Sequence, residues 1–154
     1  MIDHRFTIKS HQDDIRTFPG NYWNELLGVV SSPYDELTTV QRVGHLAYWY
    51  DAELQNGGHL QYFLNDAGKM ATETVDALNE LGAQEQFEIL STALELWKSK
   101  PRSEPASIEE YVSEVLEEEF SSLDQNYYSC ERPIVTEILE QYMLNNLDEF
   151  VVFE

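Results

Sequence analysis

Apolar residues recur at helical spacing along most of this chain. Between Val40 and Leu54 they fall on one stripe, and neighbouring aromatic residues widen the apolar surface beyond it. A helix that is apolar on several sides is usually buried. The pattern therefore predicts a buried central helix, which begins just after Ser32-Pro33, because Ser caps helices and Pro suits their first turn, and which runs to about Gln55.

Two consecutive glycines interrupt this pattern and predict a sharp corner. Because glycine adopts the left-handed conformation without a Cβ clash, we expect the helix to end there and to restart over 59–64. Nearby polar groups are expected to satisfy the free backbone groups of the turn. If Gly57 takes a positive φ, its replacement by Val should destabilise the fold by more than about 1 kcal/mol. The predicted structural corner comprises Glu53, Asn56, Gly57, Gly58 and Gln61.

Further apolar stripes predict helices around the central one. Their expected ranges are 22–30, 70–81, 84–98, 108 to about 123, and 133–147. Residues 1–20 are expected to form an irregular or short helical lead-in, with Phe6, Ile8 and Phe18 packed on the body. No alternation typical of strands exceeds a few residues. The fold class predicted is all-α: one compact domain over 1–154, a bundle of about six to eight helices with its core in 34–147.

The C-terminal tail is too apolar to remain in solvent. Val151, Val152 and Phe153 are expected either to cover the core or to pair with another subunit, so a homodimer is an open alternative. No apolar run approaches 18 residues, and the first ten residues lack the layout of a secretory signal. A cytoplasmic protein is the expectation.

Charge changes this picture more than any motif does. Asp and Glu number 29 against nine Lys and Arg, a formal net charge of −20. Such a field repels nucleic acid and anionic membranes and attracts basic surfaces. Residues 104–154 hold 14 of the acids and one base, Arg132. The expected partner is therefore a basic protein surface, with no direct binding of nucleic acid or membrane.

The helix predicted from residue 108 concentrates the acids. Seven acids lie within 16 residues, so the helix carries about one charge per 3.3 Å, close to the roughly 3.4 Å spacing along one DNA strand. The alternative interpretation is a solvated face that only keeps the protein soluble. Glu119 falls within the apolar stripe, so it either pairs with a base or marks a shift of the helix. The predicted protein-binding face comprises Glu109, Glu110, Glu114, Glu117, Glu118 and Asp124.

Candidate chemistry is sparse. The Gly-Gly corner is not followed by the Lys and Ser or Thr of a phosphate loop. The histidines lack ligand spacing, and Cys130 is the only cysteine, so we expect neither a metal site nor a cofactor. Glu53 and His59 could form an acid–base pair, which keeps a hydrolase as an alternative. No recognisable nucleophile accompanies them, so the expectation is that the protein is not an enzyme.

A resemblance adds to these inferences. The pattern E-x-x-N-G-G-x-x-Q-Y-F-x-N-x-x-G, from Glu53 to Gly68, and the A-L-x-x-L-G-A that begins at Ala77 resemble the signature of a small acidic all-helical bacterial family typified by a DNA-mimic protein. Looser similarity extends over residues 37–128. The resemblance implies a compact helical fold. It also favours a non-enzymatic acidic protein-binding domain, of which a DNA mimic that occupies the basic DNA-binding surface of a regulator is one form. An immunity-type or adaptor protein that blocks a basic toxin or nuclease site remains the alternative.

Overall fold

The computed structural model describes residues 2–9, 12–100 and 117–154. Within these ranges the chain forms eight α-helices and two short strands, so the prediction of an all-α bundle with six to eight helices is confirmed. In chain order the elements are β1 (Phe6–Ile8), α1 (Gln12–Thr17), α2 (Trp23–Val30), α3 (Thr39–Leu64), α4 (Ala71–Leu81), α5 (Gln84–Lys98), α7 (Glu117–Tyr128), α8 (Leu139–Asn145), α9 (Leu147–Phe150) and β2 (Val151–Phe153).

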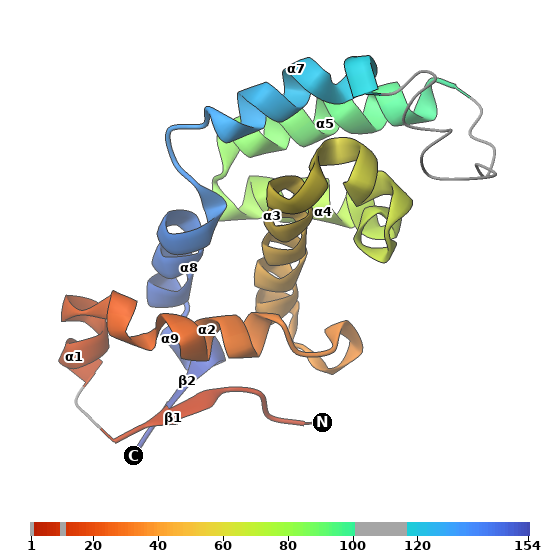
Figure 1. The fold of residues 1–154 in the computed structure, drawn as a ribbon. Helices are drawn as coiled ribbons and strands as arrows, with labels where there is room; N and C mark the ends of the chain where they lie inside the picture. Colours follow the sequence, from red (N-terminus) through yellow and green to blue (C-terminus); the bar gives the residue numbers. More distant parts are fainter. Residues whose placement is uncertain (1, 10–11, 101–116) are drawn as a thin grey trace.

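The long helix α3 forms the centre of the molecule. Figure 1 shows it running from the level of α2 to the level of α5 and α7, which lie side by side at the far end. Tyr50 and Leu54 of α3 are fully buried, and they share one core with Leu78 of α4, Leu90 of α5 and Met143 of α8. Apolar burial of this kind is the main favourable term in folding. No described helix has the length and apolar character needed to cross a membrane.

The start of α3 differs from the prediction. Residues 34–36 form a separate 3-10 turn, Leu37 is extended, and α3 begins only at Thr39. The reason is a capping box: the backbone N–H of Gln41 donates to Thr38 Oγ1 (3.2 Å), and the backbone N–H of Thr38 donates to Gln41 Oε1 (3.0 Å). These two bonds satisfy free donors of the first turn, which the Ser32-Pro33 signal does not do here.

The Gly-Gly corner is present, but the special conformation falls on the second glycine. Gly58 has φ 79° and ψ −171°, a region that is essentially restricted to glycine, and α3 kinks there before it continues to Leu64. Gly57 does not have a positive φ. The condition attached to the Gly57→Val prediction is therefore not met. Gly82, at φ 73°, ends α4 in the left-handed conformation, as predicted.

The last third of the chain departs further from the sequence pattern. The helix α7 continues past Leu123 to Tyr128, and the single helix predicted from Pro133 is broken. Val135 is extended (ψ 135°) and Thr136 has φ 73°, so the segment makes one wide turn before α8 begins at Leu139. A β-branched residue at positive φ is unusual, because its side chain crowds the backbone.

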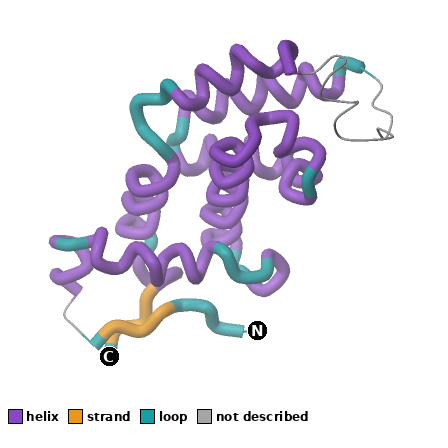
Figure 2. Tube along the Cα trace, in the orientation of Figure 1, coloured by secondary structure: helices purple, strands orange, loops and turns teal. Residues whose placement is uncertain are grey.

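The two chain ends meet in a small parallel sheet (Figure 2). Phe6, Thr7 and Ile8 pair with Val151, Val152 and Phe153 in register. The tail thus covers part of the core of its own chain, with Val151 only 2% exposed. Ile8 is buried as expected, whereas Phe18 is 61% exposed, so the expectation that it packs on the body is wrong.

Candidate functional site

Polar side chains close the corner of α3 from one side. Glu53 Oε2 accepts hydrogen bonds from Gln61 Nε2 at 2.8 Å and from Asn65 Nδ2 at 2.9 Å. Two of the groups predicted at the corner, Glu53 and Gln61, therefore bind each other across it, while Asn56 is exposed. Both donors to Glu53 are uncharged amides, so they hold its carboxylate in place without cancelling its charge.

A second, buried network of hydrogen-bonded side chains also holds the corner. The side chain of His59 is fully buried, and its Nδ1–H donates to Asp124 Oδ1 at 2.6 Å. The backbone N–H of His59 donates to the same oxygen at 2.9 Å. His59 Nε2 lies 2.8 Å from the Tyr50 hydroxyl, which donates to it when the ring is neutral. Asp124 thereby ties α7 to the corner of α3.

A second carboxylate in this region is buried beside a tyrosine. The Tyr127 hydroxyl donates to Asp51 Oδ1 at 2.5 Å, and the Tyr127 ring contacts the Tyr50 ring edge-on. Burial raises the pKa of Asp51, against the opposing effect of this hydrogen bond. Burial likewise raises the pKa of both tyrosines. These groups link α3 to α7 through the core.

The corner places Glu53 and His59 in separate networks. Glu53 binds amides of the α3 end, whereas His59 binds Asp124 and Tyr50. The acid–base pair considered for a hydrolase is therefore not formed in this structure. Among the described residues, no group of three His, Cys, Asp or Glu side chains is arranged to hold a metal ion.

Part of the predicted protein-binding face lies outside the described residues. Glu109, Glu110 and Glu114 fall there, and for Glu117 and Glu118 only the helix position is described. Asp124, the sixth member, has an internal partner in His59. Glu119 Oε1 lies 3.2 Å from Lys100 Nζ, which agrees with the first of the two alternatives for that residue. Two of the seven acids counted in the charge density of this helix, Glu119 and Asp124, therefore bind groups within the protein and do not point freely into solvent.

Two further rows of acids were missed from the sequence. One lies on α4 and one on α5, and within each helix the spacing puts all three acids on one face, within about 80° of arc. All six side chains are exposed. They are Glu73, Asp76 and Glu80 on α4, with Glu85, Glu88 and Glu95 on α5. We call these the two acidic rows. A signal was available, since residues 70–97 contain no Lys, Arg or His.

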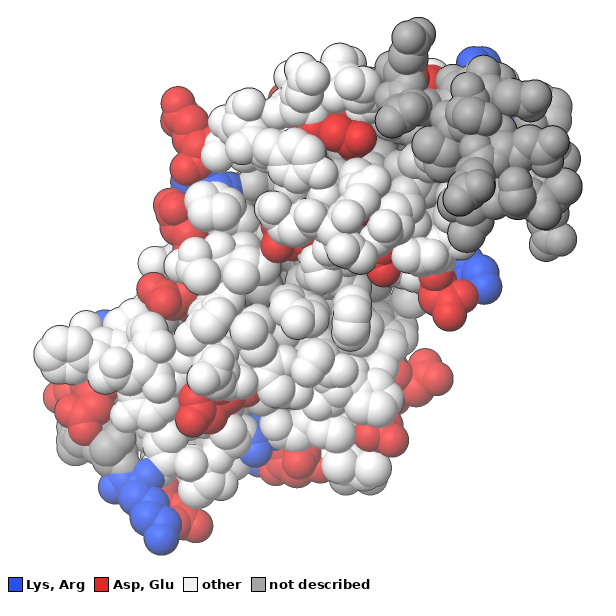
Figure 3. All heavy atoms as spheres, in the orientation of Figure 1, with Lys and Arg blue, Asp and Glu red and all other residues white. Residues whose placement is uncertain are grey.

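Within the described residues, the carboxylates of the two acidic rows form no ion pair with a Lys or Arg side chain. Several bases there pair with other acids, as Lys69 does with Asp66 and Arg132 with Glu137. Glu88 accepts from the Gln84 amide at 2.9 Å, and Glu85 from a backbone N–H at 3.3 Å. These donors are uncharged, so the rows keep their negative charge. On the face that Figure 3 views, acidic side chains are more prominent than basic ones.

A groove of about 440 Å³ runs between α5 and α7 beside the second row. Glu85 and Glu88 stand on its α5 side, Asn126 and Ser129 on its α7 side, and Ile89 and Leu123 also line it. Carboxylates beside an apolar surface suit the long stem and charged head of a Lys or Arg side chain, because both parts find a matching contact. The groove makes this end of the molecule a candidate protein-binding site.

Comparison with known proteins places the chain in a family. Residues 35–146 match the sequence model of a family described as DMP19-like protein. The match covers more than half of the chain and includes the corner, the two acidic rows and all of α8. No curated protein and no solved structure matches significantly.

Proposed function

The chain belongs to the DMP19-like protein family, and from this we propose that it is a non-enzymatic acidic domain that occupies the basic DNA-binding surface of another protein. The observation that carries the proposal is the net charge of −20, distributed so that two helix faces present carboxylates that form no ion pair with a base in the described part of the chain. The resemblance of residues 53–68 to a family typified by a DNA mimic supports the same conclusion.

Electrostatics explains how such a protein competes with DNA. The row on α4 spans about 10 Å for three charges, roughly one per 5 Å, which is sparser than the 3.4 Å of one DNA strand. Several rows are therefore needed to approach the field of a duplex. Long-range attraction between opposite charges accelerates association and weakens as salt screens it. Binding to the partner should then depend strongly on salt.

The proposal is tested with variants that remove four charges from the two acidic rows. Glu73→Gln, Asp76→Asn, Glu88→Gln and Glu95→Gln are combined, which leaves the shape of the rows nearly unchanged. A matched control removes four exposed acids elsewhere, by Asp14→Asn, Glu25→Gln, Asp35→Asn and Glu154→Gln. Both variants have the same net charge, so any difference between them reports position rather than total charge.

The measurement is capture of proteins from host lysate at low salt, followed by elution with duplex DNA. We expect the parent and the control to retain a basic protein that duplex DNA and high salt release. The acidic-row variant should bind that protein more weakly by several kcal/mol in total, at about 1 kcal/mol or somewhat more for each partly desolvated pair. Equal binding by both variants, or a complex indifferent to salt and DNA, would show that the rows only keep the protein soluble.

A further inference from the structure

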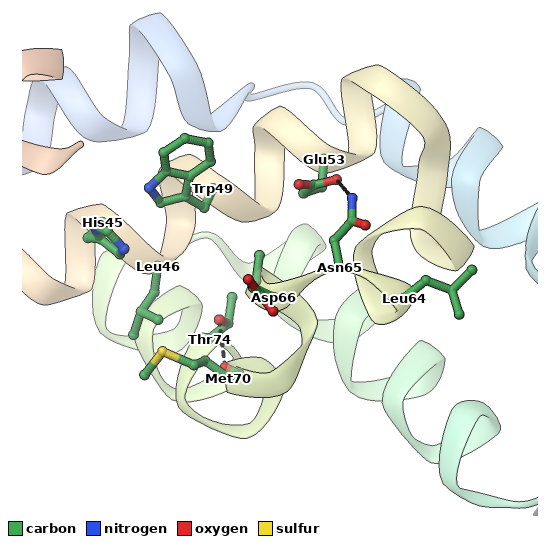
Figure 4. Close-up of a pocket in the computed structure, with 10 residues that line it drawn as sticks. His45, Leu46, Trp49, Glu53, Leu64, Asn65, Asp66, Met70 and Thr74 are labelled. Carbon is green, nitrogen blue, oxygen red and sulfur yellow. Dashed lines mark hydrogen bonds between the residues drawn. The ribbon is translucent and has the colours of Figure 1, made fainter. Parts of the chain in front are cut away.

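A hollow of about 570 Å³ lies between α3 and the segment that follows it, on a surface the proposed charge mimicry does not use. His45, Trp49 and Glu53 line it from α3, where their spacing of four residues puts them on one stripe. Met70 and Asp66 line it from η3 (Asp66–Met70), the 3-10 turn before α4. Figure 4 shows these side chains around the space, with Trp49 on the α3 side. This volume is within the range of ordinary ligand pockets.

The Trp49 indole in the hollow is exposed to solvent and is held in place by its neighbours. Trp49 is 38% exposed, which is unusual for so large an apolar side chain. The centroid of its ring lies 5.3 Å from that of Tyr48, which it meets edge-on, and 6.3 Å from that of His45. These neighbouring rings restrict its movement. The face of a tryptophan attracts cations through its π-electrons, and a ring already held in position loses little entropy on binding.

The charge of the hollow is negative. The Glu53 carboxylate is held by the amides of Gln61 and Asn65, which orient it but leave its charge. Asp66 adds a carboxylate at the mouth, although Lys69 pairs with it at 2.8 Å. His45 donates its Nδ1–H to the backbone carbonyl of Val30 at 2.7 Å, and burial lowers the pKa of its imidazole, so at neutral pH it adds no opposing charge.

We propose that this hollow is an anchor for one arginine side chain of a partner protein. Its alkyl stem lies on Leu46 and Met70, its guanidinium stacks on Trp49, and the head donates to Glu53. Arginine fits this combination because its planar head stacks on aromatic rings, is weakly hydrated and donates to carboxylates. The idea rests on the proposed function only in taking the partner to be basic. The two acidic rows would attract any basic surface, whereas an anchor of defined shape discriminates between basic partners.

The test uses N-acetylarginine amide as the probe and N-acetylcitrulline amide as its uncharged analogue. Binding is followed at low salt by NMR through the indole N–H signal of Trp49, which Trp49→Phe identifies among three tryptophans. We expect a saturable shift with the arginine compound in the millimolar range and none with citrulline. Glu53→Gln, which keeps a carbonyl for both amide donors, should raise the half-saturation concentration roughly tenfold, as expected for one charge-assisted hydrogen bond. Glu25→Gln, an exposed acid on α2, should leave it unchanged.

Three results would overturn the anchor: an equal response to citrulline, an unaltered affinity of Glu53→Gln in a protein that still folds, or no response of Trp49 to the arginine compound. None of them involves duplex DNA or the acidic rows. A protein that duplex DNA displaces from its partner, but whose Trp49 ignores arginine, would retain the proposed function and lose the anchor. The reverse pattern would retain the anchor alone.

Discussion

The corner of α3 allows a strong prediction about a single methyl group. Gly58→Ala adds a Cβ at a residue with φ 79° and ψ −171°, where strain of about 1–3 kcal/mol is expected for any residue other than glycine. The added atom would also lie 2.5 Å from Asp124 Oδ2, closer than van der Waals contact allows. Asp124 must then move away from His59, to which it is bound by two hydrogen bonds.

Together these effects should lower the free energy of unfolding by about 3 kcal/mol or more, because a hydrogen bond to a charged group contributes roughly 1.5–3 kcal/mol. For a domain with a typical stability of about 5–15 kcal/mol, that loss is large. Urea unfolding followed by far-ultraviolet circular dichroism measures it. Gly28→Ala in α2 is the matched control: its φ is not positive and its new Cβ meets no atom within 4 Å, so it should not lower the free energy of unfolding.

A double-mutant cycle separates the two causes of the loss. In a protein that already carries Asp124→Ala, the Cβ at position 58 no longer meets a carboxylate. Gly58→Ala should then lower the free energy of unfolding only by the cost of backbone strain. Two changes whose costs simply add would show that Asp124 is not displaced. If Gly58→Ala were as stable as Gly28→Ala, the assignment of the strained residue would itself be refuted.

Three further predictions concern stability. Burial raises the pKa of Asp51, so the cost of its ionised form is absent below the ordinary value of 3.8 and grows as pH rises through the raised pKa; Asp51→Asn should therefore raise the melting temperature at neutral pH and do so less near pH 3, and equal shifts would contradict this. Thr136→Asn should raise the free energy of unfolding by about 0.5–1 kcal/mol, because Asn tolerates φ 73° better than a β-branched residue does. Thr72→Asn in α4 should not raise it. The quadruple acidic-row variant should melt no lower than the parent, since removing like charges relieves repulsion, and a clear decrease would mean that these carboxylates stabilise the fold.

Helices with regular apolar spacing were predictable from the sequence. The ranges expected for α4 and α5 agree with the structure to within one residue, and Gly82 ends α4 as predicted. Both helices are set by local features: the period of the apolar positions and a glycine suited to the left-handed conformation. The corner of α3 was foreseen for the same reason, although which glycine takes the positive φ was not.

Features that join distant residues were not predictable. The pairing of β1 with β2 involves three residues in each strand and joins the two chain ends. Strands this short show no alternation of apolar and polar residues that would predict them. The bonds from Asp124 to His59 span 65 positions. They turn inward a carboxylate that the helical pattern grouped with surface acids. The acidic rows do not stand out in the net charge, because residues 1–103 hold eight Lys and Arg, although none of them lies in 70–97.

Competition for a DNA-binding surface is the central claim, and fluorescence anisotropy tests it directly. A regulator captured by this protein is first bound to its own fluorescently labelled duplex, and the acidic protein is then added at constant salt. If the two occupy the same basic surface, anisotropy should fall to the value of free DNA, and the acidic-row variant should need a higher concentration than its matched control. A rise in anisotropy would reveal a ternary complex, in which the protein and the duplex bind different surfaces, and would contradict the claim.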